Sequence, residues 1–244
     1  MDNFDPQKHN YSRPQDWAPQ NSIGGVGPQT AAQSSVEERV AFIRKVYALF
    51  FAGILFAVGG VWLGFAFPPL MIAAAQHPWI MLIVMIGAVM GTQAVRHTPG
   101  VNLVALFGFT ALTGVIISPL LYIISRSNPN SIFQAGVLTV GIFGGLTAYV
   151  FLSNRDFSFL RGMVTVGLIV VILAGLLNVL FVGSLGLGFA LAVATLLLFA
   201  GFVLYDTSNI IRRYPTNEYV SGALALYLDA LNIFLALLRI LNRR

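Results

Sequence analysis

The segment SGALALYLDALNIFLALLRIL (221–241) decides the fold, because it is long and apolar enough to cross a membrane and yet carries a carboxylate near its middle. A membrane-spanning helix needs about 20 predominantly apolar residues. An ionised side chain near the centre of a bilayer costs about 2.5–3.5 kcal/mol on insertion scales, so Asp229 requires a structural partner or a function. The preceding stretch, LLLFAGFVLYDTSNII (196–211), also contains one carboxylate, Asp206.

The composition places the whole chain in the membrane class. Of its 244 residues 57% are hydrophobic and only 9% are charged, whereas soluble domains carry about 25% charged residues. The chain has no cysteine, which excludes disulfides, thiolate metal sites and thiol catalysis. The net charge is +5, but the cations sit at the ends of apolar runs, which indicates topology signals and not nucleic-acid binding.

Two regions follow from the distribution of apolar residues. Residues 1–38 are rich in Pro, Gly, Gln and Ser, and we expect a disordered polar tail there. Residues 39–244 form the predicted transmembrane domain, an all-α integral membrane protein with seven transmembrane helices. The expected spans lie near 46–67, 78–95, 101–124, 132–152, 161–182, 184–205 and 219–241.

The distribution of lysine and arginine predicts the orientation. Counted from residue 39 onward, eight cations fall just before the first span and in alternate loops, against one, Arg126, in the remaining loops between spans. Because cytoplasmic loops carry the excess of cations, the N-terminus is predicted to be cytoplasmic. Arg243 and Arg244 conflict with this rule if the last segment crosses fully. A re-entrant last segment would remove the conflict, but its length favours crossing.

Three pairs of glycines with GxxxG spacing lie inside the expected spans. Such pairs let helices approach closely, either between two copies of a chain or within one bundle. A seven-helix bundle needs many close contacts, so packing within the bundle is the favoured interpretation. The pairs are Gly60/Gly64, Gly87/Gly91 and Gly141/Gly145.

Asp206 and Asp229 are the main candidates for a functional site. The sixth span runs inward and the seventh outward, so Asp206 at the end of one and Asp229, about 15 Å into the other, can meet in the cytoplasmic half of the bundle. Two carboxylates held close in a medium of low dielectric cannot both ionise easily, which predicts a shared proton and a pH sensor. Asp156 and Glu218 lie in loops beside arginines and are interpreted as solvated loop charges.

The neighbours of the two aspartates support this interpretation. Asn232 follows Asp229 on the same face of an otherwise Leu-rich helix, and such a polar stripe faces protein or water and not lipid. Asn209 and Arg213 share a face with Asp206 in the same way. The structural alternatives are an interfacial pairing of Asp206 with Arg213 or Arg212, and a buried salt bridge at Asp229.

Arg96 ends the second span on the same side of the membrane. It could reach either aspartate and latch the bundle, or its side chain could extend to lipid phosphates. The three histidines are separated in the sequence and form no predicted metal site.

The motifs around the two aspartates resemble those of the Bax inhibitor-1-like family, in its bacterial branch. TyrAspThr at 205–207 and LeuTyrLeuAsp followed by Asn232, Phe234 and Arg239 carry the resemblance, which extends over about residues 40–244. It implies seven helices, with the last one central and surrounded by the other six. It also implies a pH-sensitive calcium leak in which Asp206 and Asp229 form the sensor and calcium path, and Arg96 forms a latch.

The resemblance implies further expectations about partners and location. We expect a multi-pass protein of the bacterial inner membrane that needs no cofactor, with calcium as the transported ion, which Asp206 and Asp229 could bind in passing. The alternative is a non-transporting regulator of a membrane-anchored ATP-dependent protease. An enzyme is not expected: intramembrane aspartyl proteases need GlyXaaGlyAsp at the second aspartate, and this chain has LeuTyrLeuAsp.

Overall fold

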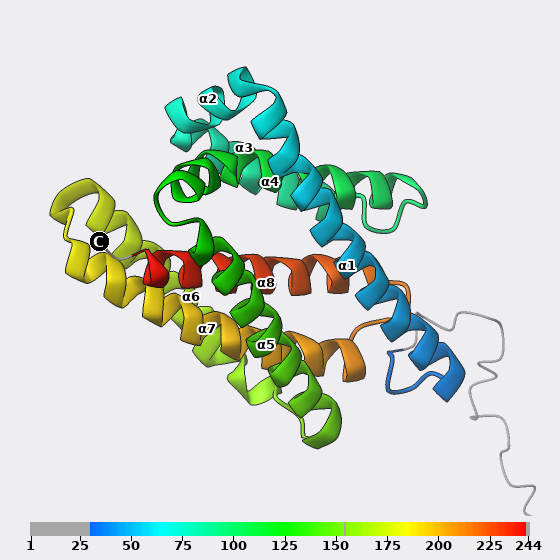
Figure 1. The fold of residues 1–244 in the computed structure, drawn as a ribbon. Helices are drawn as coiled ribbons and strands as arrows, with labels where there is room; N and C mark the ends of the chain where they lie inside the picture. Colours follow the sequence, from blue (N-terminus) through cyan, green and yellow to red (C-terminus); the bar gives the residue numbers. More distant parts are fainter. Residues whose placement is uncertain (1–29, 154, 243–244) are drawn as a thin grey trace, which may run out of the picture.

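The computed structural model describes residues 30–153 and 155–242, and these form a bundle of helices (Figure 1). A 3₁₀ turn at Ser158–Leu160 precedes α6, and a single π-helical turn at Asn178–Val182 follows it. The helices are α1 (Val36–Ala66), α2 (Pro68–Gln76), α3 (Pro78–Ala94), α4 (Val101–Ser127), α5 (Pro129–Ser153), α6 (Arg161–Leu177), α7 (Leu185–Arg212) and α8 (Tyr219–Leu241).

The helix boundaries follow local signals in the sequence. Pro68 and Pro78 start α2 and α3, where a missing backbone N–H costs nothing. Ser35 caps α1 by accepting the N–H of Glu38 at 3.2 Å, and the Glu38 carboxylate in turn accepts the N–H of Ser35 at 3.3 Å. The turn residues that separate the predicted spans therefore mark real helix ends.

The last helix occupies the centre of the bundle, as predicted. In the most apolar 18-residue stretch of α8, 56% of the residues are buried. In the corresponding stretches of the other candidate spans, 6–33% are buried. Figure 1 shows α8 in red with α1, α5 and α7 around it, and α8 packs against these three helices and against α4. Of the outer helices, α3 packs mainly on α4, and α6 mainly on α7.

Polar contacts define two ends of the bundle. At the Glu218 end, Arg96 after α3 contacts Glu218 before α8, and Ala31 before α1 donates its N–H to the carbonyl of Tyr214 at 2.9 Å. At the opposite end, which we call the Asn242 end, Asn242 after α8 donates to Ser131 at the start of α5 at 2.9 Å. The helix α8 therefore runs through the whole bundle and is not re-entrant.

The second predicted span differs from a straight helix. Six helices are long and apolar enough to cross a membrane, and α2 and α3 form a seventh crossing only as a pair bent by 99°. The short helix α2 comes after α1, at the end of α1 that is far from Glu218. The helix α3 then returns the chain to Arg96, at the Glu218 end. The described residues therefore contain six candidate crossings, and a seventh if α2 and α3 count as one bent span; its longer part is α3, whose 17 residues span about 25 Å.

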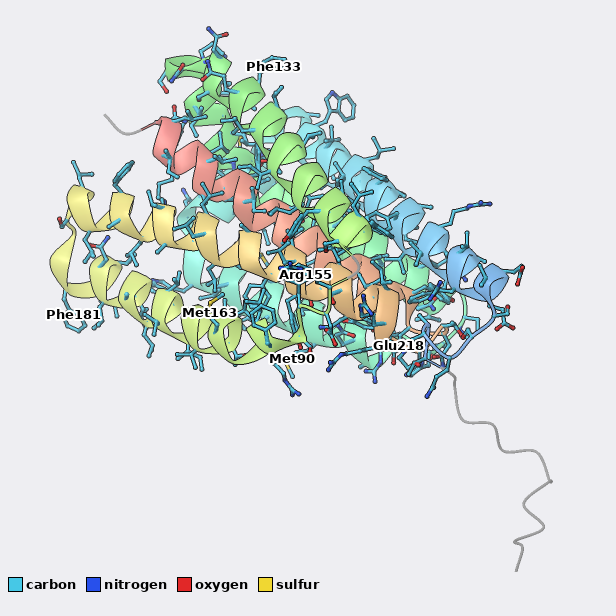
Figure 2. All side chains as sticks on the ribbon, turned by 90° about the horizontal axis from the view of Figure 1, so that it is seen from below. Met90, Phe133, Arg155, Met163, Phe181 and Glu218 are labelled. Carbon is cyan, nitrogen blue, oxygen red and sulfur yellow. The ribbon has the colours of Figure 1, made fainter. Side chains whose placement is uncertain are left out.

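The outer surface of the bundle is apolar. The side chains of Phe133 and Phe181 point away from the helices (Figure 2) and are 75% and 78% exposed. Exposed patches of this extent are not tolerated in water but match the hydrocarbon of a bilayer. The fold is that of an all-α multi-pass membrane protein.

The first helix begins earlier than the sequence suggested. Residues 30–38 fall within the tail that was expected to be disordered, yet Ala31 is fully buried, and α1 starts at Val36 and not near residue 46. The expected span began only where the apolar run begins, but the capped first turns of α1, with Glu37 and Glu38, continue the helix beyond that run. Residues 1–29, the rest of the expected tail, lie outside the described residues.

The close approach of α1 and α4 depends on glycines. A methyl group on Gly60 would overlap the carbonyl group of Ala111, and one on Gly64 would overlap the hydroxyl of Ser118. In the same way, a methyl group on Gly114 of α4 would overlap the carbonyl group of Ala57. The pair Gly60/Gly64 therefore packs within the bundle. The pairs Gly87/Gly91 and Gly141/Gly145 have open space, so no packing role is seen for them among the described residues.

Gly60→Ala should destabilise the bundle, because its methyl group meets backbone atoms that cannot move aside. We expect a cost of about 1–3 kcal/mol, seen as a lower midpoint of thermal unfolding in detergent. Gly59→Ala is the matched control, since Gly59 is exposed on the same helix and nothing lies within 4 Å of its added carbon. Equal midpoints for the two variants would contradict the packing described here.

Candidate functional site

The structure brings Asp206 and Asp229 together. Asp206 lies in the last two turns of α7, and Asp229 lies ten residues after the start of the antiparallel helix α8. The two carboxyl groups lie close enough for the charge of one to act on the other. Asp229 is only 2% exposed, so the contact lies inside the protein and not at its lipid-facing surface.

The proximity of these carboxyl groups favours a shared proton. Two ionised carboxylates at hydrogen-bonding distance in a medium of low dielectric repel each other strongly, whereas one shared proton turns the repulsion into a hydrogen bond. The Oδ2 atom of Asp229 has no hydrogen-bond partner among the described residues. No ion pair between described residues includes either carboxylate, so the salt bridge considered for Asp229 is not observed.

Tyr214 connects the aspartate pair to the Glu218 end. Burial is the main reason why the pKa of its phenol is raised, and the negative charges of Asp206 and Glu218 raise it further. Its backbone N–H donates to the carbonyl of Asn209 at 2.9 Å, and its own carbonyl accepts the N–H of Ala31. Tyr214 is thus held in place by α7 and by the segment before α1, within reach of both acidic groups.

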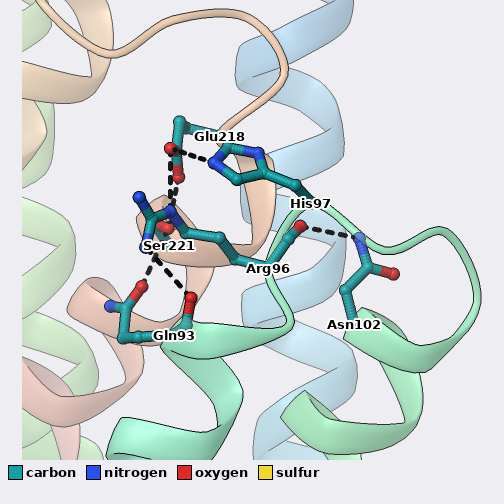
Figure 3. A network of polar contacts seen from close by, with 6 residues as sticks. All are labelled: Gln93, Arg96, His97, Asn102, Glu218 and Ser221. Atoms are coloured by element: carbon teal, nitrogen blue, oxygen red, sulfur yellow. Dashed lines mark hydrogen bonds and ion pairs between the residues drawn. The ribbon is translucent and has the colours of Figure 1, made fainter.

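Glu218 is the partner of Arg96 in this structure. The Nε of Arg96 donates to Oε1 of Glu218 at 2.9 Å, and Nε2 of His97 lies 3.1 Å from the same oxygen (Figure 3). The Glu218 side chain is only 13% exposed, so it is not the solvated loop charge that the sequence suggested. Arg96, expected to reach one of the aspartates, is held at the start of α8 instead.

Further contacts fix this network to α3 and α8. The hydroxyl of Ser221 lies 2.5 Å from Oε2 of Glu218 and 3.1 Å from the side-chain oxygen of Gln93, and Arg96 also donates to the carbonyl of Gln93 at 3.0 Å (Figure 3). Burial alone would raise the pKa of Glu218, but the hydrogen bonds from Ser221 and Arg96 outweigh it and lower that pKa. Glu218 therefore stays ionised, and its charge at the N-terminus of α8 also suits the helix dipole.

The other predicted polar residues have local roles. Asn232 donates to the carbonyl of Leu228 at 2.7 Å in its own helix, and buried Asn209 accepts the N–H of Arg213 at 2.7 Å through its backbone carbonyl. The Arg213 side chain pairs with Asp156 at 3.0 Å, so its suggested pairing with Asp206 is wrong. The N–H of Ser158 and then Arg213 lower the pKa of Asp156 to about 2.

The aspartate pair is not a preformed metal cage. In residues 30–153 and 155–242, no three histidines or acidic residues gather as metal ligands. Calcium takes six to eight oxygen ligands, and the pair offers four at most. The two carboxylates alone therefore do not complete the ligand shell of a calcium ion.

Comparison with known proteins agrees with this architecture. A family described as "Inhibitor of apoptosis-promoting Bax1" matches residues 39–244. The chain is 37% identical to an uncharacterised protein of Campylobacter jejuni over 82% of this chain and 87% of the relative. It is 33% identical to Protein lifeguard 4 of mouse, over 86% and 88%, and 33% identical to Bax inhibitor 1 of Schizosaccharomyces pombe, over 86% and 79%. The chain therefore belongs to the Bax inhibitor-1-like family of multi-pass membrane proteins.

Proposed function

We propose that this protein is a pH-sensitive calcium leak channel gated by Asp206 and Asp229. The observation that carries the proposal is the placement of two carboxyl groups near each other between α7 and the central helix, with Asp229 only 2% exposed, where one proton decides whether they attract or repel. Intramembrane carboxylates commonly mark ion and proton paths. Hard oxygen ligands of this type suit calcium.

Arg96 is proposed to exchange partners between Glu218 and Asp206. Tyr214 senses the charge of both acidic residues, so the two lie close to one common side chain. At alkaline pH both aspartates ionise, and the unpaired charge attracts the guanidinium of Arg96, which then latches the α3–α4 loop to α7. At acid pH the pair shares a proton, and Arg96 returns to Glu218, as in the arrangement described above.

The direction of the pH response follows from this exchange. Acid removes the charge that attracts Arg96 and releases the latch on α7, so acid favours calcium flux. The groups that set the response are thus the aspartate pair, Glu218 and Arg96.

Two variants at the latch test the proposal by calcium flux into proteoliposomes over a pH series. Glu218→Gln removes the competing partner of Arg96, so the flux profile should shift toward acid by about one pH unit, equivalent to about 1.4 kcal/mol. Arg96→Ala should raise the flux at alkaline pH, and Arg96→Lys should restore closure only in part, because lysine lacks the planar fork.

Asp156→Asn is the control for these variants, because Asp156 belongs to a separate ion pair with Arg213. We expect it to leave the flux profile of the wild type unchanged. The partner exchange is refuted if Glu218→Gln keeps the wild-type profile, or if Arg96→Ala still closes at alkaline pH. A wild type without calcium flux at any pH would refute the leak function itself.

We further propose that the Glu218 end faces the cytoplasm of a bacterial cell, across its inner membrane. Of the described cations, eight lie at this end, and only Arg126 and Arg239 lie at the Asn242 end. Cysteines introduced at exposed Asn217 and Ser127 test this orientation. We expect an impermeant thiol reagent to label position 217 only from the cytoplasmic side and position 127 only from the other, and the reverse pattern would overturn the orientation.

The alternative function, regulation of a membrane-anchored protease, depended on the predicted tail. Most of that tail, residues 1–29, lies outside the described residues. Within the described part, residues 30–38, Thr30 and Ala31 contact Pro215 and Tyr214 of the same chain. No observation favours this alternative, and it stays a hypothesis.

A further inference from the structure

A pocket of about 430 Å³ lies between α1, α4, α5 and α8. Its floor is one face of the central helix, formed by Tyr227, Ala230, Leu231 and Phe234. The volume falls in the range of about 300–1,000 Å³ that is typical of ligand-binding pockets. Neither the aspartate pair nor the Glu218 network lines it.

The walls of this pocket offer almost no polar atoms. Thr139 and Tyr227 are its only lining residues with side-chain oxygens, and both hydroxyls are engaged elsewhere. The hydroxyl of Thr139 donates to the carbonyl of Ala135 at 2.7 Å, and that of Tyr227 contacts the hydroxyl of Thr113. A cavity lined in this way excludes water and polar ligands, and favours hydrocarbon.

The pocket opens toward the surroundings of the bundle and not toward its ends. Val58 and Val140 at its rim are 61% and 73% exposed, and no atom lies within 4 Å of a carbon added to Gly136. Leu121 and Thr139 lie six and ten residues from the helix ends at Ser127 and Pro129, which corresponds to a depth of about 9–15 Å. At that depth a bilayer presents the acyl chains of one leaflet.

We propose that this pocket binds one acyl chain of a phospholipid from the leaflet at the Asn242 end. The hydrocarbon walls, the lateral opening and the depth all match an acyl chain, while a headgroup would remain at the level of the helix ends. The bound chain packs on the floor residues of α8, the helix that also carries Asp229, and thereby supports its position. The inference concerns lipid binding and holds whether or not the protein conducts calcium.

An indole at the floor of the pocket provides the test. Phe234→Trp is made in a background in which Trp17, Trp62 and Trp79 are replaced by Phe, and the protein is placed in bilayers containing phospholipids brominated in the middle of one acyl chain. Bromine quenches indole fluorescence only at close range, so a chain in the pocket should quench the reporter strongly. Gly136→Phe should fill the pocket and reduce that quenching several-fold.

Gly144→Phe is the matched control, since it adds the same side chain on the same helix at an exposed position with open space. It should leave the quenching unchanged. The proposal is overturned if bromine quenches the indole equally in the Gly136→Phe and Gly144→Phe variants, because the indole then contacts only the lipid that surrounds any membrane protein. It is also overturned if the reporter is unquenched and chemical cross-linking gives a dimer, because a second copy then covers the pocket.

A second measurement does without the Phe234→Trp reporter, so the proposal can be tested even if that variant fails to fold. Native mass spectrometry of the delipidated protein, titrated with phospholipid, should show one tightly retained lipid for the wild type and for Gly144→Phe, and its loss in Gly136→Phe. Equal retention by all three proteins would overturn the assignment.

Discussion

The burial of one carboxylate, Asp229, in the central helix is the constraint on which the rest of the structure depends. A charge at this place would cost several kcal/mol in lipid. Two features of the fold offset that cost: α1, α4, α5 and α7 pack around α8, and Asp206 on α7 supplies a group with which Asp229 can share a proton. The carboxylate is tolerated only while the central helix remains surrounded and the partner remains in contact.

Close packing around α8 keeps it surrounded. The glycines of α1 and α4 let these helices approach within backbone contact, which brings both against the central helix. On the other side α7 runs antiparallel to α8 and carries Asp206 to the level of Asp229. The polar groups described here are thereby separated into an aspartate pair inside the bundle and an ion-paired network around Glu218 at its end. Tyr214 lies within electrostatic reach of both.

The sequence predicted the parts of this arrangement that depend on regular geometry. Hydropathy and turn residues located the spans, and the alternating direction of consecutive helices placed Asp206 opposite Asp229. The first turns of α1 were missed, because Glu37 and Glu38 lie beyond the apolar run although the helix continues through them. The bend between α2 and α3 was missed as well, since residues 68–76 are apolar but too short to register as a separate helix.

The surroundings of the site were harder to predict than the aspartates themselves. Glu218 looked like a solvated charge because its burial depends on Arg96, which is 122 positions away along the chain. Nothing in the sequence around Tyr214 indicated its position, because that position depends on contacts with Ala31 and with the end of α7. The proximity of Glu218 and Ser221, three residues apart at the start of a helix, was the one local signal available.

The pH dependence of calcium flux in proteoliposomes carrying Asp206→Asn or Asp229→Asn tests the central claim most directly. Asparagine keeps the shape and the hydrogen bonding of aspartate but cannot gain or lose the proton. We expect either variant to abolish the pH dependence between mildly acid and mildly alkaline conditions while both proteins remain folded. A full wild-type pH response in both variants would contradict it and would leave the two aspartates with a purely structural role.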